Sequence, residues 1–408
     1  MSPNQPASLG AAAVRPFREP VQLQWNRFVG VSIILVVIGV SVFIVGLTQG
    51  YATRVWETYL VNLLFFLGVA ESGVIASCAF YLTQGRWCGT VHYRLAEAFS
   101  GFIPLAFILF WGVFFGRAHI FPWITHPSLL YAPAKHVWLN VPFLFARDGA
   151  ALLLLTVLSM WFVRKSRGPE AERWAEDGET IEMPPKALRR LAPAIAILYC
   201  YVFSMLSVDL IMSLSPVWRS TLFGWWYFAG AFWSAAAAMA LAAVFFRRVL
   251  GPSNAFTSRK TLHDLGLFVF AFSVFWIYLS FAQYLVIWYG DIPAETYFIV
   301  VRAWHQPWST LTWMAPLLMW AVPFVVLMGV RPKTTPAILG TVAFLGLCGV
   351  WILNYILIVP SLFPNQLPFG WIEVGITLGF LGAFGLCSKP GLALVADAAT
   401  AGMDGGER

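Results

Sequence analysis

Charged residues are scarce in this chain. They make up 11% of its 408 residues, whereas soluble globular domains carry about 25%. Hydrophobic residues account for 59%, with 20 tryptophans among them. Apolar runs of about 20 residues, the length needed to span a bilayer, recur along the whole sequence. The composition excludes a soluble globular protein and predicts one that crosses the membrane many times.

Cysteine is also scarce, and its spacing carries no motif. The five cysteines are Cys78, Cys88, Cys200, Cys348 and Cys387. None forms a CxxC pair, and no CxxCH haem-attachment motif occurs. Four of the five lie in or beside apolar segments. We therefore expect neither a disulfide framework nor a metal centre.

Histidine is missing from the middle of every apolar run. A membrane b-type cytochrome needs paired axial histidines on facing helices, well inside the bilayer. The six histidines here lie in loops or near helix ends: His92, His119, His126, His136, His263 and His305. We therefore expect no haem or iron–sulfur cluster in this chain, and no covalently bound cofactor.

Ten apolar runs, separated by polar breaks, predict ten transmembrane helices. Their expected bounds are 27–48, 55–83, 92–115, 138–163, 190–214, 219–246, 263–289, 306–329, 335–359 and 370–388. Helices 2–5 and helices 6–9 run in the same order of directions, as a repeated four-helix unit would. We expect an all-α membrane protein with two four-helix bundles, at 55–214 and 219–359, flanked by helices 1 and 10.

The two ends of the chain are expected to be tails, at 1–26 and 389–408. The first 25 residues are polar and proline-rich and lack an A-x-A-like cleavage site, so we expect no cleaved signal peptide. Twenty of the 26 Lys and Arg residues fall on the side of the termini in this topology. The positive-inside rule then places both termini in the cytoplasm. The net charge of +7 is read as an orientation signal, with no nucleic-acid partner.

Ionisable residues inside the apolar runs fall at graded depths in helices 2–5. Glu97 lies close to the cytoplasmic end, and Glu71 lies near mid-depth. Arg147 and Asp148 lie about 15 Å below the outer end of helix 4, and Asp209 lies near the outer end of helix 5. Helices 6–9 contain little that is comparable. Such groups are costly in a membrane and usually face a protein interior.

Two interpretations of these residues remain open. In one, the charges only hold the helices of a bundle together. In the other, Glu71, Glu97, Asp148 and Asp209 form a proton relay, together with Arg147. A relay also needs hydroxyl groups between its carboxylates, and helix 5 offers Tyr201 and Ser204.

The outer loop 116–137 and the start of helix 4 are rich in histidine and aromatic residues. Aromatic belts at the membrane interface explain much of this composition. The sharper interpretation is a quinol pocket, because oxidation of a quinol requires groups that accept its two protons. The candidate residues for menaquinone or ubiquinone binding are His126, Tyr131, Lys135, His136, Trp138 and Asn140.

One stretch is more specific than the rest, TLHDLGLFVFAFSVFWIYLSFAQYLVIWYGDIPAET at 261–296. It carries an H-D-L-G start, a W-x-Y core, an F-A-Q-Y segment and a D-I-P turn. A second stretch, 126–148, carries the pairs His126-Pro127 and Arg147-Asp148. Both resemble an NrfD-like integral membrane subunit of alternative complex III, a bacterial quinol:electron-acceptor oxidoreductase.

This resemblance implies a place in a larger assembly of the bacterial cytoplasmic membrane. The partners it implies are a homologous NrfD-like quinone-binding subunit, a periplasmic iron–sulfur protein, multihaem and monohaem cytochromes c, and small membrane subunits. Proton conduction is the role we expect for this chain, with a quinol pocket as a second one. A non-catalytic scaffold for the iron–sulfur protein is the first alternative. A secondary transporter is the second, although no span shows the mid-depth break that transporters use.

Overall fold

The computed structural model describes residues 25–84, 89–130, 132–176, 184–250 and 258–404. Helix is the only regular secondary structure in these ranges, and ten helical spans are long and apolar enough to cross a membrane. The predicted fold class is therefore confirmed. The predicted tail 1–26 lies almost wholly outside the described residues.

The spans begin and end close to the predicted positions. The first five are α1 (Trp25–Thr48), α2 (Ala52–Leu82), α3 (Gly89–Glu97) continued by η2 (Ser100–Phe102) and α4 (Ile103–Ile120), α7 (Val141–Ser166), and α9 (Lys186–Leu210) with η4 (Met212–Leu214). The next five are α10 (Phe223–Leu250), α11 (Arg259–Gly290), α13 (Trp308–Pro316) continued by η6 (Leu317–Ala321) and α14 (Val322–Val326), α16 (Pro336–Ile358) with η7 (Val359–Ser361), and α17 (Trp371–Asp404). Short helices connect them: α5 (Pro122–Thr125), η3 (Pro127–Leu129), α6 (Pro133–Trp138), α8 (Pro169–Glu176), α12 (Pro293–Ala303) and α15 (Val330–Thr334).

The largest departure from the predicted bounds is at the C-terminal end. We expected the last helix to stop at 388 and a tail to follow, but α17 continues through Pro390 to Asp404. Proline inside a helix normally favours a break. Here the helix is held by packing, because Gly391 and Gly101 let α17 approach the chain around Ala98 closely. A Cβ on Gly391 would lie 2.2 Å from the carbonyl oxygen of Ala98.

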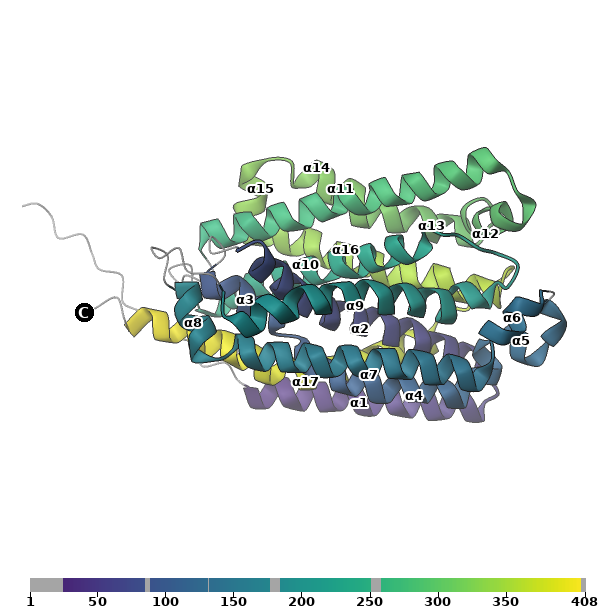
Figure 1. The fold of residues 1–408 in the computed structure, drawn as a ribbon, viewed down its shortest axis with the longest axis horizontal. Helices are drawn as coiled ribbons and strands as arrows, with labels where there is room; N and C mark the ends of the chain where they lie inside the picture. Colours follow the sequence, from purple (N-terminus) through teal and green to yellow (C-terminus); the bar gives the residue numbers. More distant parts are fainter. Residues whose placement is uncertain (1–24, 85–88, 131, 177–183, 251–257, 405–408) are drawn as a thin grey trace, which may run out of the picture.

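The helices form two four-helix bundles side by side (Figure 1). We call α2, α4, α7 and α9 the first bundle, and α10, α11, α13–α14 and α16 the second bundle. Helix α2 packs on α10, which joins the two bundles. Helix α2 is the central element, because 89% of its most apolar window is buried. Helices α1 and α17 pair with each other and cover α2 from outside the bundles.

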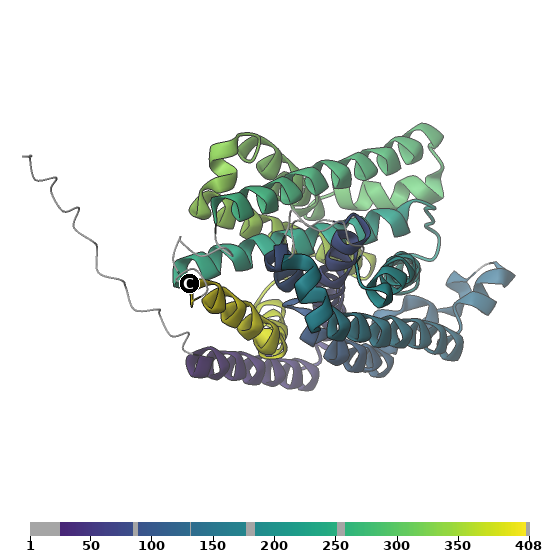
Figure 2. The ribbon, with the colours of Figure 1, turned by 60° about the vertical axis from the view of Figure 1, so that its left-hand side comes forward.

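Helices α1 and α17 lie side by side (Figure 2), and glycines form much of their contact. A Cβ on Gly39 would lie 2.3 Å from the Cα atom of Gly379, and one on Gly382 would lie 2.5 Å from the carbonyl oxygen of Ser32. Small residues let membrane helices approach until their backbones touch, which favours dispersion contacts that lipid cannot replace. This glycine seam holds the first and last spans together.

The molecule has two distinct ends (Figure 1). The terminal end carries α3, α8, α15 and the last turns of α17. The loop end carries α5, α6 and α12. The assignment of the terminal end to the cytoplasm remains a prediction from the distribution of Lys and Arg.

Candidate functional site

The loop end of the first bundle holds a buried cluster of three charged residues. Nη2 of Arg147 donates a hydrogen bond of 2.6 Å to Oδ2 of Asp209. Nε of Arg147 lies 3.6 Å from Oδ1 of Asp148. Both carboxylate side chains are inaccessible to solvent, and the Arg147 side chain is 12% exposed. One cation therefore faces two carboxylates, which leaves an excess negative charge that one bound proton would neutralise.

Helix α6 covers this cluster through Trp138. Its Nε1 donates a hydrogen bond of 2.9 Å to Oδ1 of Asp209. The guanidinium of Arg147 lies 3.9 Å from the Trp138 ring centroid and 4.7 Å from that of Phe143. Aromatic faces attract cations, so the two rings help to hold Arg147 in place. Helix α7 starts at Val141 rather than at 138, so Asp148 lies about 10 Å from the helix start instead of about 15 Å.

The middle of the first bundle holds Glu71, which is fully buried. Oγ of Ser159 on α7 donates a hydrogen bond of 2.9 Å to Oε2 of Glu71. Oε1 of Glu71 has no hydrogen-bond partner in the described part of the chain. A buried carboxylate with a free oxygen is costly unless it binds a proton or water.

The next residue on α2 belongs to a chain of hydroxyl groups. The Tyr199 hydroxyl on α9 lies 2.7 Å from Oγ of Ser72 and donates a hydrogen bond of 3.0 Å to the carbonyl oxygen of Phe228 on α10. Because the single phenolic proton goes to Phe228, Ser72 donates to Tyr199. This chain connects the first bundle with the second.

The terminal end of the first bundle holds Glu97, which is also fully buried. Oγ of Ser77 donates a hydrogen bond of 2.8 Å to Oε1 of Glu97, and Nε of Arg167 lies 3.4 Å from Oε2. The Arg167 side chain is 25% exposed. Glu97 is therefore paired with a cation, Arg167, that extends toward the surface at the terminal end of the bundle.

The three groups are separated along the bundle axis. Glu71 and Ser77 are six residues apart on α2, which corresponds to about 9 Å. Asp148 and Ser159 are eleven residues apart on α7, or about 16 Å. Thr156 lies between them, buried and without a hydrogen-bond partner for its hydroxyl among the described residues. No hydrogen bond between described residues joins one group directly to the next. A proton would therefore need water to pass between them.

Two predicted relay residues lie elsewhere. Tyr201 is 54% exposed on the outside of the bundle. Ser204 packs against Gly224, and a Cβ added to Gly224 would lie 2.7 Å from the Cβ of Ser204. Residues two apart on a helix point to nearly opposite sides, so Tyr199 faces inward where Tyr201 does not. The buried positions 199, 202, 203, 206 and 210 follow helical spacing, and this pattern is the signal that identifies Tyr199.

The predicted quinol residues are not brought together around a cavity. His126, His136 and Asn140 are exposed, and Tyr131 lies outside the described residues. Lys135 donates to the carbonyl oxygen of Pro216, and Trp138 is bound to Asp209. Both side chains thus fasten α6 to the first bundle. The cavity found in the second bundle is lined by none of these residues.

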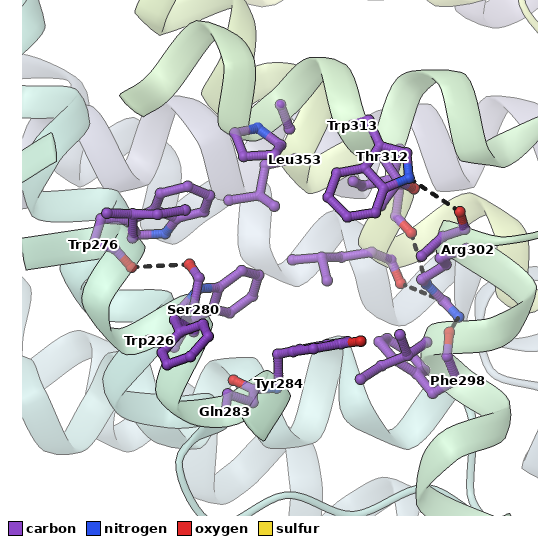
Figure 3. A pocket seen from close by; sticks show the side chains of 18 of the residues that line it. Trp226, Trp276, Ser280, Gln283, Tyr284, Phe298, Arg302, Thr312, Trp313 and Leu353 are labelled. Atoms are coloured by element: carbon purple, nitrogen blue, oxygen red, sulfur yellow. Dashed lines mark hydrogen bonds between the residues drawn. The ribbon is translucent and has the colours of Figure 1, made fainter. Parts of the chain in front are cut away.

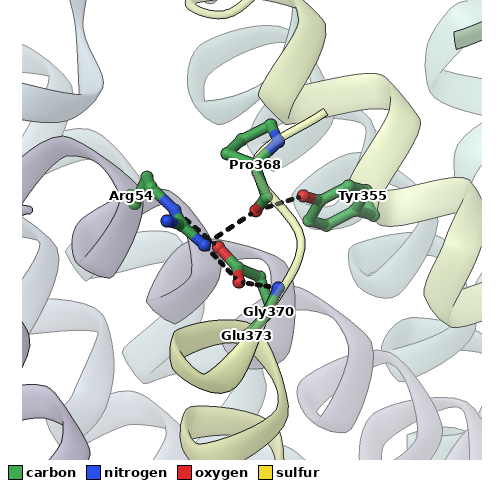
Figure 4. Close-up of polar contacts among 5 residues, drawn as sticks. All are labelled: Arg54, Tyr355, Pro368, Gly370 and Glu373. Carbon is green, nitrogen blue, oxygen red and sulfur yellow. Dashed lines mark hydrogen bonds and ion pairs between the residues drawn. The ribbon is translucent and has the colours of Figure 1, made fainter. Parts of the chain in front are cut away.

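A further buried carboxylate, Glu57, lies at the loop end of α2 and was missed by the sequence argument. It is 1% exposed, and neither of its oxygens has a hydrogen-bond partner within the described ranges. Three residues earlier, Arg54 forms a bidentate ion pair with Glu373 of α17, with N–O distances of 3.0 and 2.7 Å (Figure 4). Arg54 also donates to the carbonyl oxygen of Pro368, as does the Tyr355 hydroxyl. The pair fastens α17 to α2 at this end.

Comparisons with known proteins assign no family. Neither a protein-family model nor a curated protein sequence matches this chain. Within the described residues, no group of three His, Cys, Asp or Glu side chains could hold a metal ion. The features that bear on function are therefore the buried side chains and the motifs at 126–148 and 261–296.

Proposed function

We propose that this chain is a membrane subunit of a quinol-oxidising electron-transfer complex and that its first bundle conducts protons. The observation that supports proton conduction is the row of buried carboxylates at three depths of the first bundle. Asp148 and Asp209 lie near the loop end, Glu71 in the middle and Glu97 toward the terminal end. Ionisable residues at membrane depth are costly, and they commonly mark ion and proton paths.

Each group in the row has a feature suited to holding or releasing a proton. Asp148 and Asp209 share one guanidinium, so the cluster accommodates one proton without a net positive charge. Glu71 has one oxygen bound to Ser159 and one free. Glu97 is bound by Ser77 and approached by the partly exposed Arg167. Transfer between the groups requires bridging water, for which the free Thr156 hydroxyl is a partner between Asp148 and Ser159.

The electron-transfer part of the proposal rests on the resemblance of 126–148 and 261–296 to NrfD-like subunits of alternative complex III. The partners are then a homologous quinone-binding subunit, a periplasmic iron–sulfur protein, cytochromes c and small membrane subunits. In the bacterial cytoplasmic membrane, with cytoplasmic termini, the loop end would face the periplasm. Helices α5, α6 and α12 would then be the surface under the iron–sulfur protein.

The first experiment is mass spectrometry of the proteins that co-purify with a tagged copy of this chain in mild detergent. Recovery of a second ten-helix protein, an iron–sulfur protein and c-type cytochromes is the expected result. The intact complex is then reconstituted into vesicles, and protons translocated per electron are measured for Asp148→Asn and Glu71→Gln. Both variants should assemble and should translocate fewer protons. Glu170→Gln, an exposed carboxylate on α8, is the matched control.

Two other outcomes would support the alternatives. Normal proton translocation in both variants would favour the non-catalytic scaffold. In that alternative, ion pairs such as Arg54–Glu373 only hold helices together. Recovery of this chain alone, as a stable oligomer, would favour a transporter. One observation supports that last possibility: contrary to the sequence argument, the eighth span is interrupted by the π-helical turn η6, between Pro316 and Pro323.

A further inference from the structure

A cavity of 510 Å³ lies in the half of the second bundle nearer the loop end (Figure 3). Its walls come from α10, α11, α12, α13 and α16, and most of its lining is aromatic or aliphatic. The aromatic rings include Trp226, Trp276, Tyr284, Trp313 and Trp320. Cavities of about 300–1,000 Å³ with this character are typical of small-molecule sites.

The cavity has lining residues on the lipid-facing surface of the protein. Phe281 and Tyr284 on α11 are 59% and 39% exposed, and Trp313 on α13 is 58% exposed. All three lie in spans that are long and apolar enough to cross the membrane. Their exposed surfaces would therefore meet lipid, and a ligand dissolved in the bilayer could reach the cavity between α11 and α13.

A break in the eighth span lies beside the cavity. Pro316 lacks the amide hydrogen that would continue the α-helical pattern, and the chain forms the π-helical turn η6 directly after it. Single π-helical turns often occur at functional sites. Pro316 at the end of α13 and Trp320 in this turn both line the cavity. On the opposite wall, Nε1 of Trp226 donates a hydrogen bond of 2.6 Å to Oγ of Ser280, which fixes that ring.

Three polar atoms in the lining have no hydrogen-bond partner in the described chain. They are Oε1 of Gln283, the hydroxyl of Thr312 and Nε1 of Trp276. All three side chains line the cavity. Burying a polar group without a partner costs free energy, and a ligand with both donors and acceptors would remove that cost. An acyl chain has neither, and would leave all three unpaired.

A buried cation closes the cavity at the loop end. Arg302 on α12 donates to the carbonyl oxygens of Ile356 at 2.8 Å, Leu357 at 3.1 Å and Phe298 at 3.2 Å, and to Oγ of Ser361 at 2.8 Å. Burial lowers the pKa of Arg302 to about 9, so the guanidinium remains charged at neutral pH. No carboxylate forms an ion pair with it in the described residues. Its charge favours an electron-rich oxygen on a ligand.

We propose that this cavity binds a lipid-soluble planar ring that carries oxygen substituents, the chemical class to which quinones and phenols belong. The aromatic walls fit a flat ring, the three unpaired polar atoms fit its oxygens, and the lipid-facing side chains fit its route of entry. The proposal concerns the second bundle alone and does not depend on proton conduction by the first.

The test is equilibrium binding of radiolabelled decylubiquinone to the purified full chain in lipid nanodiscs. The wild-type chain should show saturable binding. Thr312→Val and Gln283→Leu each remove an unpaired polar atom, and each should raise Kd about two- to tenfold. Thr312→Val also keeps the shape of the side chain. Thr310→Val, on the same helix but exposed and outside the lining, is the control and should leave Kd unchanged.

Three outcomes would overturn the proposal. The first is the absence of saturable binding by the wild-type chain. The second is an unchanged Kd in both Thr312→Val and Gln283→Leu. The third is equal competition by decylbenzene, which has the same chain and a ring without oxygens, because the cavity would then be a purely apolar site. Each can be observed whatever the proton measurements give.

Discussion

The two bundles have the same arrangement of four helices but opposite interiors. The spans of the first bundle bury five carboxylates in the described part of the chain, at Glu57, Glu71, Glu97, Asp148 and Asp209. The second bundle is neutral across its middle, where Asn354 is a buried polar residue, and it contains the aromatic cavity. The shared topology therefore determines how the helices are arranged, and the side chains inside each bundle determine which chemistry that bundle can support.

The same contrast applies to the buried arginine near the loop end of each bundle. Arg147 is neutralised by carboxylates, chiefly Asp209. Arg302 donates its hydrogen bonds within the described ranges to carbonyl oxygens and to Ser361, not to a carboxylate. The first arginine depends on one strong partner, whereas the second distributes its hydrogen bonds over several weaker ones. The predictions that follow test this difference.

The largest effect is expected for Asp209→Ala. Arg147 would lose its 2.6 Å partner and keep only Asp148, 3.6 Å away, and Trp138 would lose its acceptor. Breaking a buried ion pair by removing one partner costs about 3–5 kcal/mol of unfolding free energy. The corresponding change in the second bundle, Ser361→Ala, removes one acceptor among several and should cost about 1 kcal/mol. Unfolding of the purified chain in mixed micelles, followed by tryptophan fluorescence, measures both. Equal losses would mean that the two arginines are held in the same way.

The next effect is expected for Trp138→Phe. This change keeps an aromatic ring over Arg147 but removes the N–H group that donates to Asp209. A hydrogen bond to a charged group contributes about 1.5–3 kcal/mol, and the unfolding free energy should fall by that amount. Trp225→Phe, at a position 61% exposed on α10, serves as the control. A similar loss in the control would show that the indole ring itself matters, not the hydrogen bond.

A smaller effect separates two buried tyrosines. Tyr199→Phe removes two hydrogen bonds, one with Ser72 and one to the carbonyl oxygen of Phe228. Tyr227→Phe in the second bundle removes only one, to Oδ1 of Asn354. Each lost hydrogen bond costs about 1 kcal/mol, so the first variant should be the less stable by about that much. The reverse order of midpoints in the same unfolding assay would contradict the hydroxyl chain between the bundles.

The smallest change in stability is expected for Thr156→Val. The Thr156 hydroxyl has no partner in the described chain, so replacing it with a methyl group should change the unfolding free energy by less than about 0.5 kcal/mol. Proton translocation by the assembled complex should fall, because a bridging water would lose a hydrogen-bond partner. Unchanged translocation would remove Thr156 from the path while leaving the carboxylates in it.

The helices themselves could be predicted from the sequence because apolar runs of the right length have few other structures in a membrane. Every predicted span is a helix in the structure, and the grouping into two bundles followed from the order of directions. The end of α17 could not be predicted, since the contact of Gly391 with Ala98 is made across the fold.

The candidate site was predicted in part. The depths of Glu71, Glu97, Asp148 and Asp209 follow from the length of each run, and all four are buried. Which face of a helix points inward does not follow from length, which is why Tyr201 was chosen where Tyr199 is buried. The cavity has lining residues from five helices, so no single run of sequence could show it.

The central position of α2 also constrains how the protein is made. Helix α2 carries Glu57 and Glu71, both covered in the finished fold. The helices that pack on it, α9, α10, α16 and α17, are synthesised later. A charged residue at the centre of an inserting helix costs about 2.5–3.5 kcal/mol. During biogenesis α2 must therefore keep its carboxylates protonated or remain against the insertion machinery until its neighbours arrive.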